Sequence, residues 1–514
     1  MMGIVGIVAS LALLIFLAYR GISVLLLAPA MALLAVLFSP EAPLLASYTQ
    51  VFMTALAGFV ALYFPLFLLG ALFGKLMEAS GAARDIANGI AAALGRERAI
   101  LAIVLACAVL TYGGVSLFVV AFAVYPIAVA LFREAELPKR LIPATIALGA
   151  FTFTMTALPG TPAIQNAIPM PYFGTTPFAA PGLGVIAALV MGGLGTAWLM
   201  RRAAAARRAG EGYDDPAHPA DSTDSAETAP AHDESPSRPA KQLREHAQGE
   251  GYDLMELGRP ALAHGSGAGT PPVQQASHAT RPGFAVSVAP VVLVILLNYI
   301  FSALVFPTLD TAYLAEDRFG ATGINALLGV WSIIAALTVS ITVLLALHGR
   351  RIADLRQALG DGANASVQPI LNTASLVGYG AVIASMAGFV LIRDAVLNIA
   401  PGNPLVSLSV AVNVLAGITG SASGGMSIAL QTLGANYLEL GREAGIAPDL
   451  LHRVTAIATG GLDALPHNGA VITLLAICKL THRQSYADIF VVAVAIPLLA
   501  LAAVITLGSM FGSF

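Results

Sequence analysis

The sequence has very little charge for its length. Of its 514 residues, only 11% are Asp, Glu, Lys or Arg, whereas 57% are hydrophobic. Soluble domains carry about 25% charged residues, so this composition excludes an ordinary globular enzyme. The formal net charge of −3 provides no basic surface for nucleic acid, and we expect no such partner.

Cysteine and catalytic motifs are also scarce. Only Cys107 and Cys478 occur, far apart in apolar runs, which excludes a disulfide framework and gives no metal-ligand spacing. We therefore expect neither a metal nor a cofactor. The sequence contains no GxxxxGK[ST] loop of ATP-driven pumps and no HExxH or GxSxG motif. These absences predict that the protein is not an enzyme.

Long apolar runs are what the sequence does contain. A run of about 20 residues crosses about 30 Å of hydrocarbon. Such runs are found at 2–19, 22–38, 51–74, 99–131, 141–158, 184–200, 284–306, 323–347, 366–391, 404–438, 454–477 and 486–510. Two of them, 99–131 and 404–438, exceed one span, and each contains a glycine pair. Each is therefore either two spans or a re-entrant, broken hairpin. The sequence predicts an all-α polytopic membrane protein with about 11–14 transmembrane helices.

A polar stretch divides the chain into two hydrophobic halves. Residues 201–283 are rich in Ala, Pro, Gly, Ser, His and acids without apolar periodicity, which predicts a disordered linker between membrane repeats at 1–200 and 284–514. Basic residues gather in the loops 75–98, 133–140 and 349–356 and at the start of the linker. The positive-inside rule then places the linker in the cytoplasm and the N-terminus outside. Because Arg20 follows the first apolar run, we expect that run to be an uncleaved span.

The two halves share an ordered pair of motifs. Gly113-Gly114-Val115-Ser116 is followed by Ala157-Leu158-Pro159-Gly160-Thr161, and Gly424-Gly425-Met426-Ser427 by Ala464-Leu465-Pro466-His467-Asn468. The loop after the second glycine pair, 439–453, lacks a basic excess, so we place it outside and predict that the halves are inverted copies. Inverted repeats with broken helices are typical of secondary transporters. The alternative is an accidental similarity between small-residue packing faces.

Turn formers and hydroxyls interrupt four of the apolar runs, at 111–116, 156–166, 419–425 and 463–468. Broken backbone at membrane depth must be buried in protein or line a cavity, and a helix that restarts there presents free N–H groups and a positive dipole end. We therefore expect the substrate contacts to come from Gly113, Gly114, Ser116, Gly160, Thr161, Ser421, Ser423, Gly424, Gly425, His467 and Asn468. The alternative for each hydroxyl is a bond to its own preceding helical turn.

Ionisable residues near these breaks are few, and charge inside a membrane is a functional hypothesis by default. Asp463 and His467 flank Leu465-Pro466, and imidazole titrates near neutral pH. We predict that Asp463 and His467 carry the coupled proton. The alternatives are a helix-break partner for Asp463 and a neutral imidazole bonded to a backbone carbonyl for His467.

The motifs together resemble the gluconate:proton symporter (GntP) family. The resemblance rests on Tyr112–Phe118, Thr156–Pro162, Pro169–Gly174, Gly420–Ser427 and Leu465–Val471, and it covers 1–200 and 284–514. Within the family, the pattern is most similar to the D-β-hydroxybutyrate permease branch. The resemblance implies proton-coupled uptake of a small hydroxy-carboxylate across a bacterial inner membrane. It also implies a homodimer whose protomers contain paired re-entrant hairpins. The 201–283 insert departs from the compact family pattern.

The residues fit a monocarboxylate better than a multiply charged acid, because the candidate site contains no Lys or Arg. Gluconate and 3-hydroxybutyrate both remain open, and the apolar surroundings favour the smaller acid. One alternative is a Na⁺- or H⁺-coupled transporter of dicarboxylates or citrate. Alternatives of other classes are a non-transporting scaffold, a channel or an intramembrane enzyme.

Overall fold

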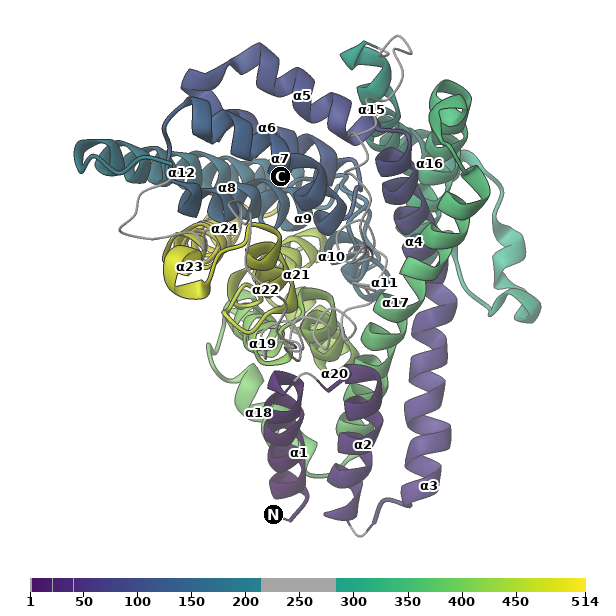
Figure 1. The fold of residues 1–514 in the computed structure, drawn as a ribbon. Coiled ribbons are helices and arrows are strands. Elements are labelled where there is room, and N and C mark those ends of the chain that lie inside the picture. The colour runs from purple at the N-terminus through teal and green to yellow at the C-terminus, as the bar shows by residue number, and fades with distance from the viewer. Residues whose placement is uncertain (1, 21, 40, 214–282) are drawn as a thin grey trace, which may run out of the picture.

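The computed structural model describes residues 2–20, 22–39, 41–213 and 283–514. The first half forms a series of helices: α1 Met2–Tyr19, α2 Val24–Leu37, α3 Leu44–Ala46, α4 Met53–Ala79, α5 Ala82–Leu94, α6 Ala99–Tyr112, α7 Leu117–Glu134, α8 Ile142–Ala150, α9 Phe153–Thr156, α10 Ile164–Ala167, α11 Pro169–Phe173 and α12 Pro181–Arg208. Figure 1 shows their arrangement.

The second half continues the all-helical fold: α15 Phe284–Ile300, α16 Ile324–His348, α17 Leu355–Ser385, α18 Phe389–Leu397, α19 Pro404–Thr419, α20 Ala422–Glu443, α21 Pro448–Leu462, α22 Gly469–Ile477, α23 His482–Phe490 and α24 Ile496–Phe511. None of the described residues forms a strand. Seven described helical segments are long and apolar enough to cross a membrane, and three shorter apolar helices accompany them. The all-α membrane fold predicted from hydropathy is confirmed. The predicted linker lies mostly outside the described residues, although α12 continues to Arg208.

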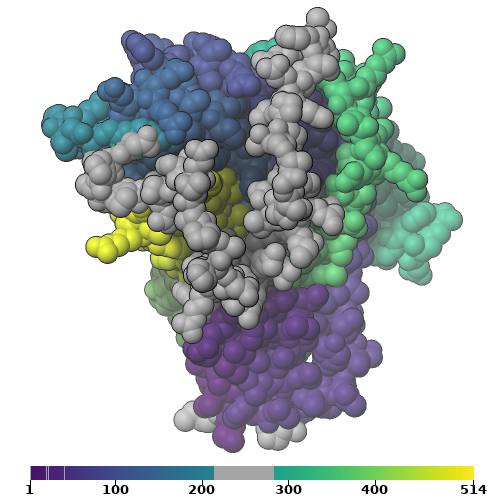
Figure 2. Space-filling view, in the orientation of Figure 1, coloured from purple at the N-terminus to yellow at the C-terminus, as the bar shows by residue number. Residues whose placement is uncertain are grey.

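Two long helices, α4 and α17, pack side by side and form one wall of the molecule (Figure 1). α17 begins at Leu355, eleven residues before the apolar run from which it was predicted. Its polar first turns are helical because Asp354 caps them, with Oδ1 accepting from the N–H of Gln357 at 2.9 Å. They also pack on α4, where Gly362 lies against Leu72. In the space-filling view (Figure 2), the N-terminal helices form the lower end of the molecule.

Both runs that exceed one span, 99–131 and 404–438, are helix pairs joined by a tight turn. α6 and α7 pack together across the turn 113–116, and α19 and α20 pack across the turn 420–421. The arms before the turns have 14 and 16 residues, or about 21 and 24 Å of helix, too short to cross about 30 Å of hydrocarbon. In Figure 1, α6 and α7 lie in the upper half and α19 and α20 in the lower half. That placement agrees with inverted copies, which stay a prediction.

The other two predicted breaks are also non-helical. The chain leaves the helical conformation at 157–163, between α9 and α10, and at 463–468, between α21 and α22. One basic loop, 75–98, instead contains the amphipathic helix α5, whose buried apolar side includes Ala83, Ile86 and Ala87. Local sequence therefore located these four breaks, but neither the break at 151–152 between α8 and α9 nor the helix within this loop.

Candidate functional site

A cavity of about 320 Å³ lies between the α4–α17 wall and the two hairpin turns. Most of its lining comes from α4, α17, the two hairpins and the first break, and Val24, Met155 and Leu337 complete it. Its residues include Leu66, Phe67 and Gly70 of α4, Gly114, Ser116 and Leu117 of the first hairpin, Pro162, Ala163 and Gln165 of the first break, Ser366, Asn372, Thr373 and Leu376 of α17, and Thr419, Ser421 and Ser423 of the second hairpin. Segments about 300 residues apart in the chain thus meet at one site.

The first hairpin turn presents Gly114 and Ser116 to this cavity. Gly114 has φ +93°, a left-handed conformation that glycine adopts without strain. Gly113 does not line the cavity, because it packs against the side chain of Val291 on α15. α7 begins directly after Ser116, so its positive dipole end lies at the cavity wall.

The second hairpin turn presents Ser421 and Ser423. Ser421 caps α20, since its Oγ accepts from the N–H of Gly424 at 3.2 Å, and the Ser423 hydroxyl lies 3.4 Å from that of Thr373 on α17. Gly424 lies one helical turn past the tip and packs against Leu376. Gly425 lies where α20 crosses the backbone of α19 most closely. Both glycines therefore shape the hairpin rather than contact the cavity.

The first break places its backbone, not the predicted hydroxyl, near the site. Gly160 packs against the ring of Phe178, and its carbonyl accepts from Asn298 Nδ2 at 3.0 Å. Thr161 is fully buried, and its Oγ1 accepts from the N–H of Ala163 at 3.3 Å. Neither residue is among those that line the cavity, whereas the next residues, Pro162 to Gln165, are.

The second break borders a smaller cavity of about 140 Å³ that shares Ser421, Ser423 and Gln165 with the larger one. Asp463 and Asn468 line it. Asn468 caps α22, because its Oδ1 accepts from the N–H of Ala470 at 2.7 Å, and its Nδ2 donates to the Gly420 carbonyl at 2.7 Å. Asn468 thus connects the second break to the hairpin tip.

His467 is placed by the structure beside the hairpin instead of in either cavity lining. Its Nε2 lies 2.9 Å from the Gly417 carbonyl of α19, which is the carbonyl-bonded arrangement considered from the sequence. Asp463 is the ionisable residue in the lining of the smaller cavity, and the lining of the larger cavity contains no charged residue.

The repeat extends to the capping geometry of the two breaks. The motif alignment pairs Thr161 with Asn468 and Ala163 with Ala470. In each break, the first side chain accepts a hydrogen bond from the N–H two residues later, at 3.3 Å and 2.7 Å respectively. Local conformation is therefore similar where the sequence motif is similar.

Gln165 is a functional candidate that sequence reasoning did not single out. It lines both cavities and is only 7% exposed, and its Oε1 has no hydrogen-bond partner within the described part of the chain. Thr111 Oγ1, in the same cavity lining, is likewise buried without a partner there. Because unpaired buried polar atoms are costly, they indicate where a ligand or water bonds. The position of Gln165 inside the predicted 156–166 break was the available signal.

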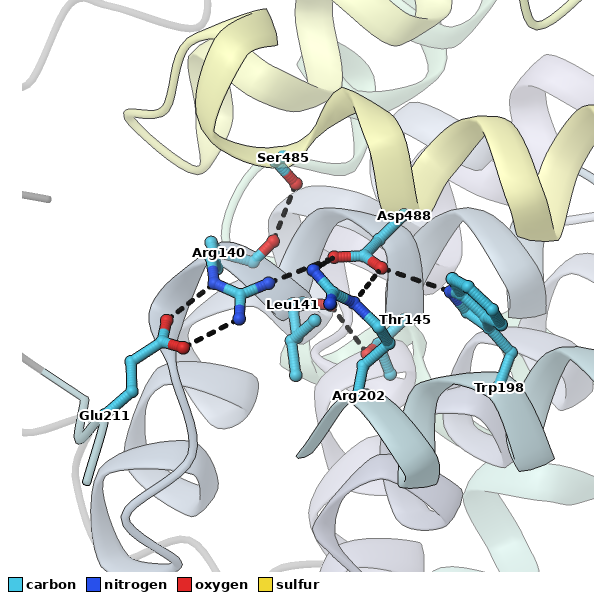
Figure 3. A network of polar contacts seen from close by, with 8 residues as sticks. All are labelled: Arg140, Leu141, Thr145, Trp198, Arg202, Glu211, Ser485 and Asp488. Carbon is cyan, nitrogen blue, oxygen red and sulfur yellow. Dashed lines mark hydrogen bonds and ion pairs between the residues drawn. The ribbon is translucent and has the colours of Figure 1, made fainter. Parts of the chain in front are cut away.

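A polar network joins three elements on the far side of the first hairpin (Figure 3). The Asp488 carboxylate, on α23, accepts from Arg140 Nη1 at 3.2 Å, Arg202 Nε at 2.8 Å and Trp198 Nε1 at 3.1 Å. Glu211 forms a two-point pair with Arg140 at 2.6 and 2.7 Å, and this hydrogen bonding raises the pKa of Arg140 above its usual value. The network ties α12 and α23 to the start of α8.

Metal-ligating residues do not cluster in the described residues: no group of three His, Cys, Asp or Glu is placed to hold an ion. Cys107 and Cys478 are both buried free thiols. The arrangement at the cavity offers hydroxyls, amides and helix ends, which suit the binding of a small polar anion.

Comparison with known proteins gives two matches. The family model described as "GntP family permease" matches residues 2–224. The chain is also similar to a Bacillus subtilis (strain 168) protein named "Uncharacterized transporter YxjC", with 41% identity over 516 aligned residues that cover 99% of this chain and 100% of that protein.

Proposed function

Because the chain belongs to the GntP family of permeases, we propose that this multi-pass membrane transporter takes up a small hydroxy-monocarboxylate together with protons. The membrane is the inner membrane of a bacterium. The observation that carries the proposal is a cavity lined by hydroxyls, amides and helix starts but by no charged side chain.

The charge of the substrate follows from the helix ends. α7, with 18 residues, and α20, with 22, both begin at the larger cavity. Each helix start is equivalent to roughly half an elementary positive charge, so together they match one carboxylate. A tricarboxylate would leave most of its charge uncompensated there, which is why a monocarboxylate is favoured.

The rest of the substrate follows from the size and polarity of the cavity. Its volume of about 320 Å³ is at the lower end of the range of about 300–1,000 Å³ for small-molecule sites. Ser421, Ser423 and Thr373 suit a substrate hydroxyl, whereas Leu66 and Phe67 suit a short hydrocarbon chain. Both 3-hydroxybutyrate and gluconate fit this description, and the apolar wall favours the former.

Proton coupling is assigned to Asp463, with His467 supporting it. Asp463 lines the smaller cavity beside Ser421 and Ser423. Protonation of its carboxylate there removes the repulsion between that carboxylate and an anion in the adjoining cavity. His467 bonds the carbonyl of Gly417 in the hairpin arm. Because a carbonyl only accepts, Nε2 donates this bond, and protonation of the ring at Nδ1 would strengthen it and hold the hairpin arm against the second break.

The test is uptake of labelled D-3-hydroxybutyrate and gluconate into proteoliposomes, with and without an inward proton gradient. Wild type should accumulate one acid in a saturable, gradient-driven manner. Asp463→Asn should still equilibrate that acid down its own gradient but lose gradient-driven accumulation, and His467→Ala should impair both. If neither acid moves under any gradient, the substrate class is wrong, and dicarboxylates with Na⁺ should be tried next.

A paired substitution tests the cavity itself. Gln165→Leu removes the amide, whose Oε1 is unpaired, at nearly constant size. Oε1 can accept from the substrate hydroxyl, and we expect KM to rise roughly tenfold, near the upper end for one lost neutral hydrogen bond. Gln50→Leu changes an exposed glutamine remote from the cavity lining and should leave KM unchanged. An unchanged KM for Gln165→Leu would exclude this cavity as the binding site.

A further inference from the structure

A buried arginine lies directly behind the first break. Arg453, on α21, is completely buried, and its side chain is the largest of the fully buried ones in the described part of the chain. The prediction that Arg453 lies in a loop is wrong, because α21 begins at Pro448. Since a guanidinium keeps its proton in proteins, a full positive charge is buried here.

The hydrogen bonds of Arg453 all go to neutral oxygens. Its Nε and Nη2 donate to the Ala179 carbonyl at 3.0 and 2.7 Å, and Nη2 also reaches the Pro177 carbonyl at 3.5 Å. Its Nη1 donates to Asn166 Oδ1 at 3.2 Å. No Asp or Glu of the described chain lies within 4.0 Å of it, and Asp449, one turn earlier on α21, acts on it only at longer range. The hydrogen bonds are satisfied while the charge is not paired.

Asn166 connects this charge to the cavity wall. Its Nδ2 donates to the carbonyls of Thr161 and Pro177, both at 3.0 Å, so its Oδ1 must be the acceptor for Arg453. The same Oδ1 lies 3.2 Å from His452 Nε2, which therefore carries a hydrogen, and His452 Nδ1 lies 2.6 Å from the Thr175 hydroxyl. Because a second buried charge beside Arg453 is unfavourable, His452 is a neutral imidazole whose Nδ1 accepts from Thr175.

Asn166 is separated from the cavities by one position in the chain, because its neighbour Gln165 lines both of them. The interior screens charge weakly, so a cation behind this wall attracts an anion in front of it. A carboxylate side chain against Arg453 would cancel that attraction, whereas carbonyl and amide oxygens leave the net charge in place.

We infer that Arg453 is a positioning residue whose fixed positive charge adds to that of the two helix starts and attracts the transported anion from behind the cavity wall. It does so while it holds Asn166 and the 177–179 segment in place. The inference rests on the proposed function only in requiring that the transported ligand is an anion.

Two substitutions separate charge from shape. Arg453→Gln removes the charge, and Arg453→Lys keeps the charge but loses the planar fork of donors. For uptake of D-3-hydroxybutyrate into proteoliposomes, we expect Arg453→Gln to raise KM by roughly tenfold or more with a smaller effect on kcat, and Arg453→Lys to stay within about threefold of wild type. Arg442→Gln, at an exposed site near the end of α20, is the control and should leave KM unchanged. Equal increases in KM for Arg453→Lys and Arg453→Gln would show a purely structural role and overturn the inference.

A third variant covers the case in which Arg453→Gln does not fold. Asn166→Asp places a carboxylate against Arg453, but it also loses the Nδ2 bonds to the carbonyls of Thr161 and Pro177. Asn166→Leu loses the same bonds without adding charge and is the control. We expect a higher KM for Asn166→Asp than for Asn166→Leu. Equal KM in these two variants would also overturn the inference.

The two proposals fail in different ways. If wild type takes up only a dicarboxylate, the hydroxy-monocarboxylate assignment is wrong, and the same variants are compared with that acid. If wild type shows neither uptake nor thermal stabilisation with any acid of the panel, both proposals are wrong.

Discussion

Substituting Gly425 by alanine should force the second hairpin open. A Cβ at this position would overlap the backbone N and Cα of Ala416 on the opposite arm and lie 2.5 Å from the carbonyl carbon of Leu415. Ordinary contacts begin at 3.4 Å, so α19 and α20 must separate by at least about 1 Å. The obstructing atoms are backbone, and no side-chain rotation can relieve the overlap.

The rigidity of the two helix backbones determines how much Gly425→Ala lowers the free energy of unfolding. Overpacking of a well-packed interior costs about 1–3 kcal/mol, and we expect Gly425→Ala to lie near the upper end because neither arm can yield locally. Gly425 is only four residues from Ser421, which lines the cavity. Separation of the arms therefore also displaces Ser421 and Ser423, so we expect the maximal uptake rate to fall by more than about tenfold, which corresponds to about 1.4 kcal/mol.

The assay combines uptake in proteoliposomes with the thermal unfolding midpoint of the purified protein in detergent. Gly193→Ala is the matched control, since Gly193 is an exposed residue within α12 and a Cβ there meets nothing within 4 Å. It should leave both measurements unchanged. Wild-type uptake and stability in Gly425→Ala would refute the close crossing of the hairpin arms.

Two further substitutions test the surrounding framework. Asp488→Ala leaves Arg202 without a carboxylate, whereas Arg140 keeps its pair with Glu211. We therefore expect a loss of about 2–3 kcal/mol, below the usual 3–5, because Arg202 is also partly exposed. Asp394→Ala, whose ion pair is largely exposed, should cost under about 1 kcal/mol, and equal shifts in unfolding midpoint for both variants would contradict this. Asn468→Ala removes the α22 cap and the bond to Gly420, so it should cost about 1–2 kcal/mol and slow uptake. Asn468→Asp loses only the bond to Gly420 and should be intermediate in the same two assays. Wild-type behaviour of Asn468→Asp would show that the bond to Gly420 is unimportant.

Local sequence by itself determined the membrane class and the places where helices break. Hydropathy predicted the spans because a helix in lipid must be apolar over its length. Glycine, proline and small hydroxyl residues predicted the four breaks because they weaken a helix at their own positions. The same local information placed Gly114, Ser116, Ser421, Ser423, Asp463 and Asn468 in segments that border the two cavities.

Only the tertiary structure decided which residues face one another across the molecule. Gly113, Gly424 and Gly425 belong to the same motifs as cavity residues, but they pack against neighbouring helices, and sequence spacing does not tell a packing glycine from a binding one. The sequence predicts a polar loop at 439–453, yet the fold buries the side chain of Arg453 behind Asn166. Its role depends on residues almost 300 positions away, and no local pattern records such a contact.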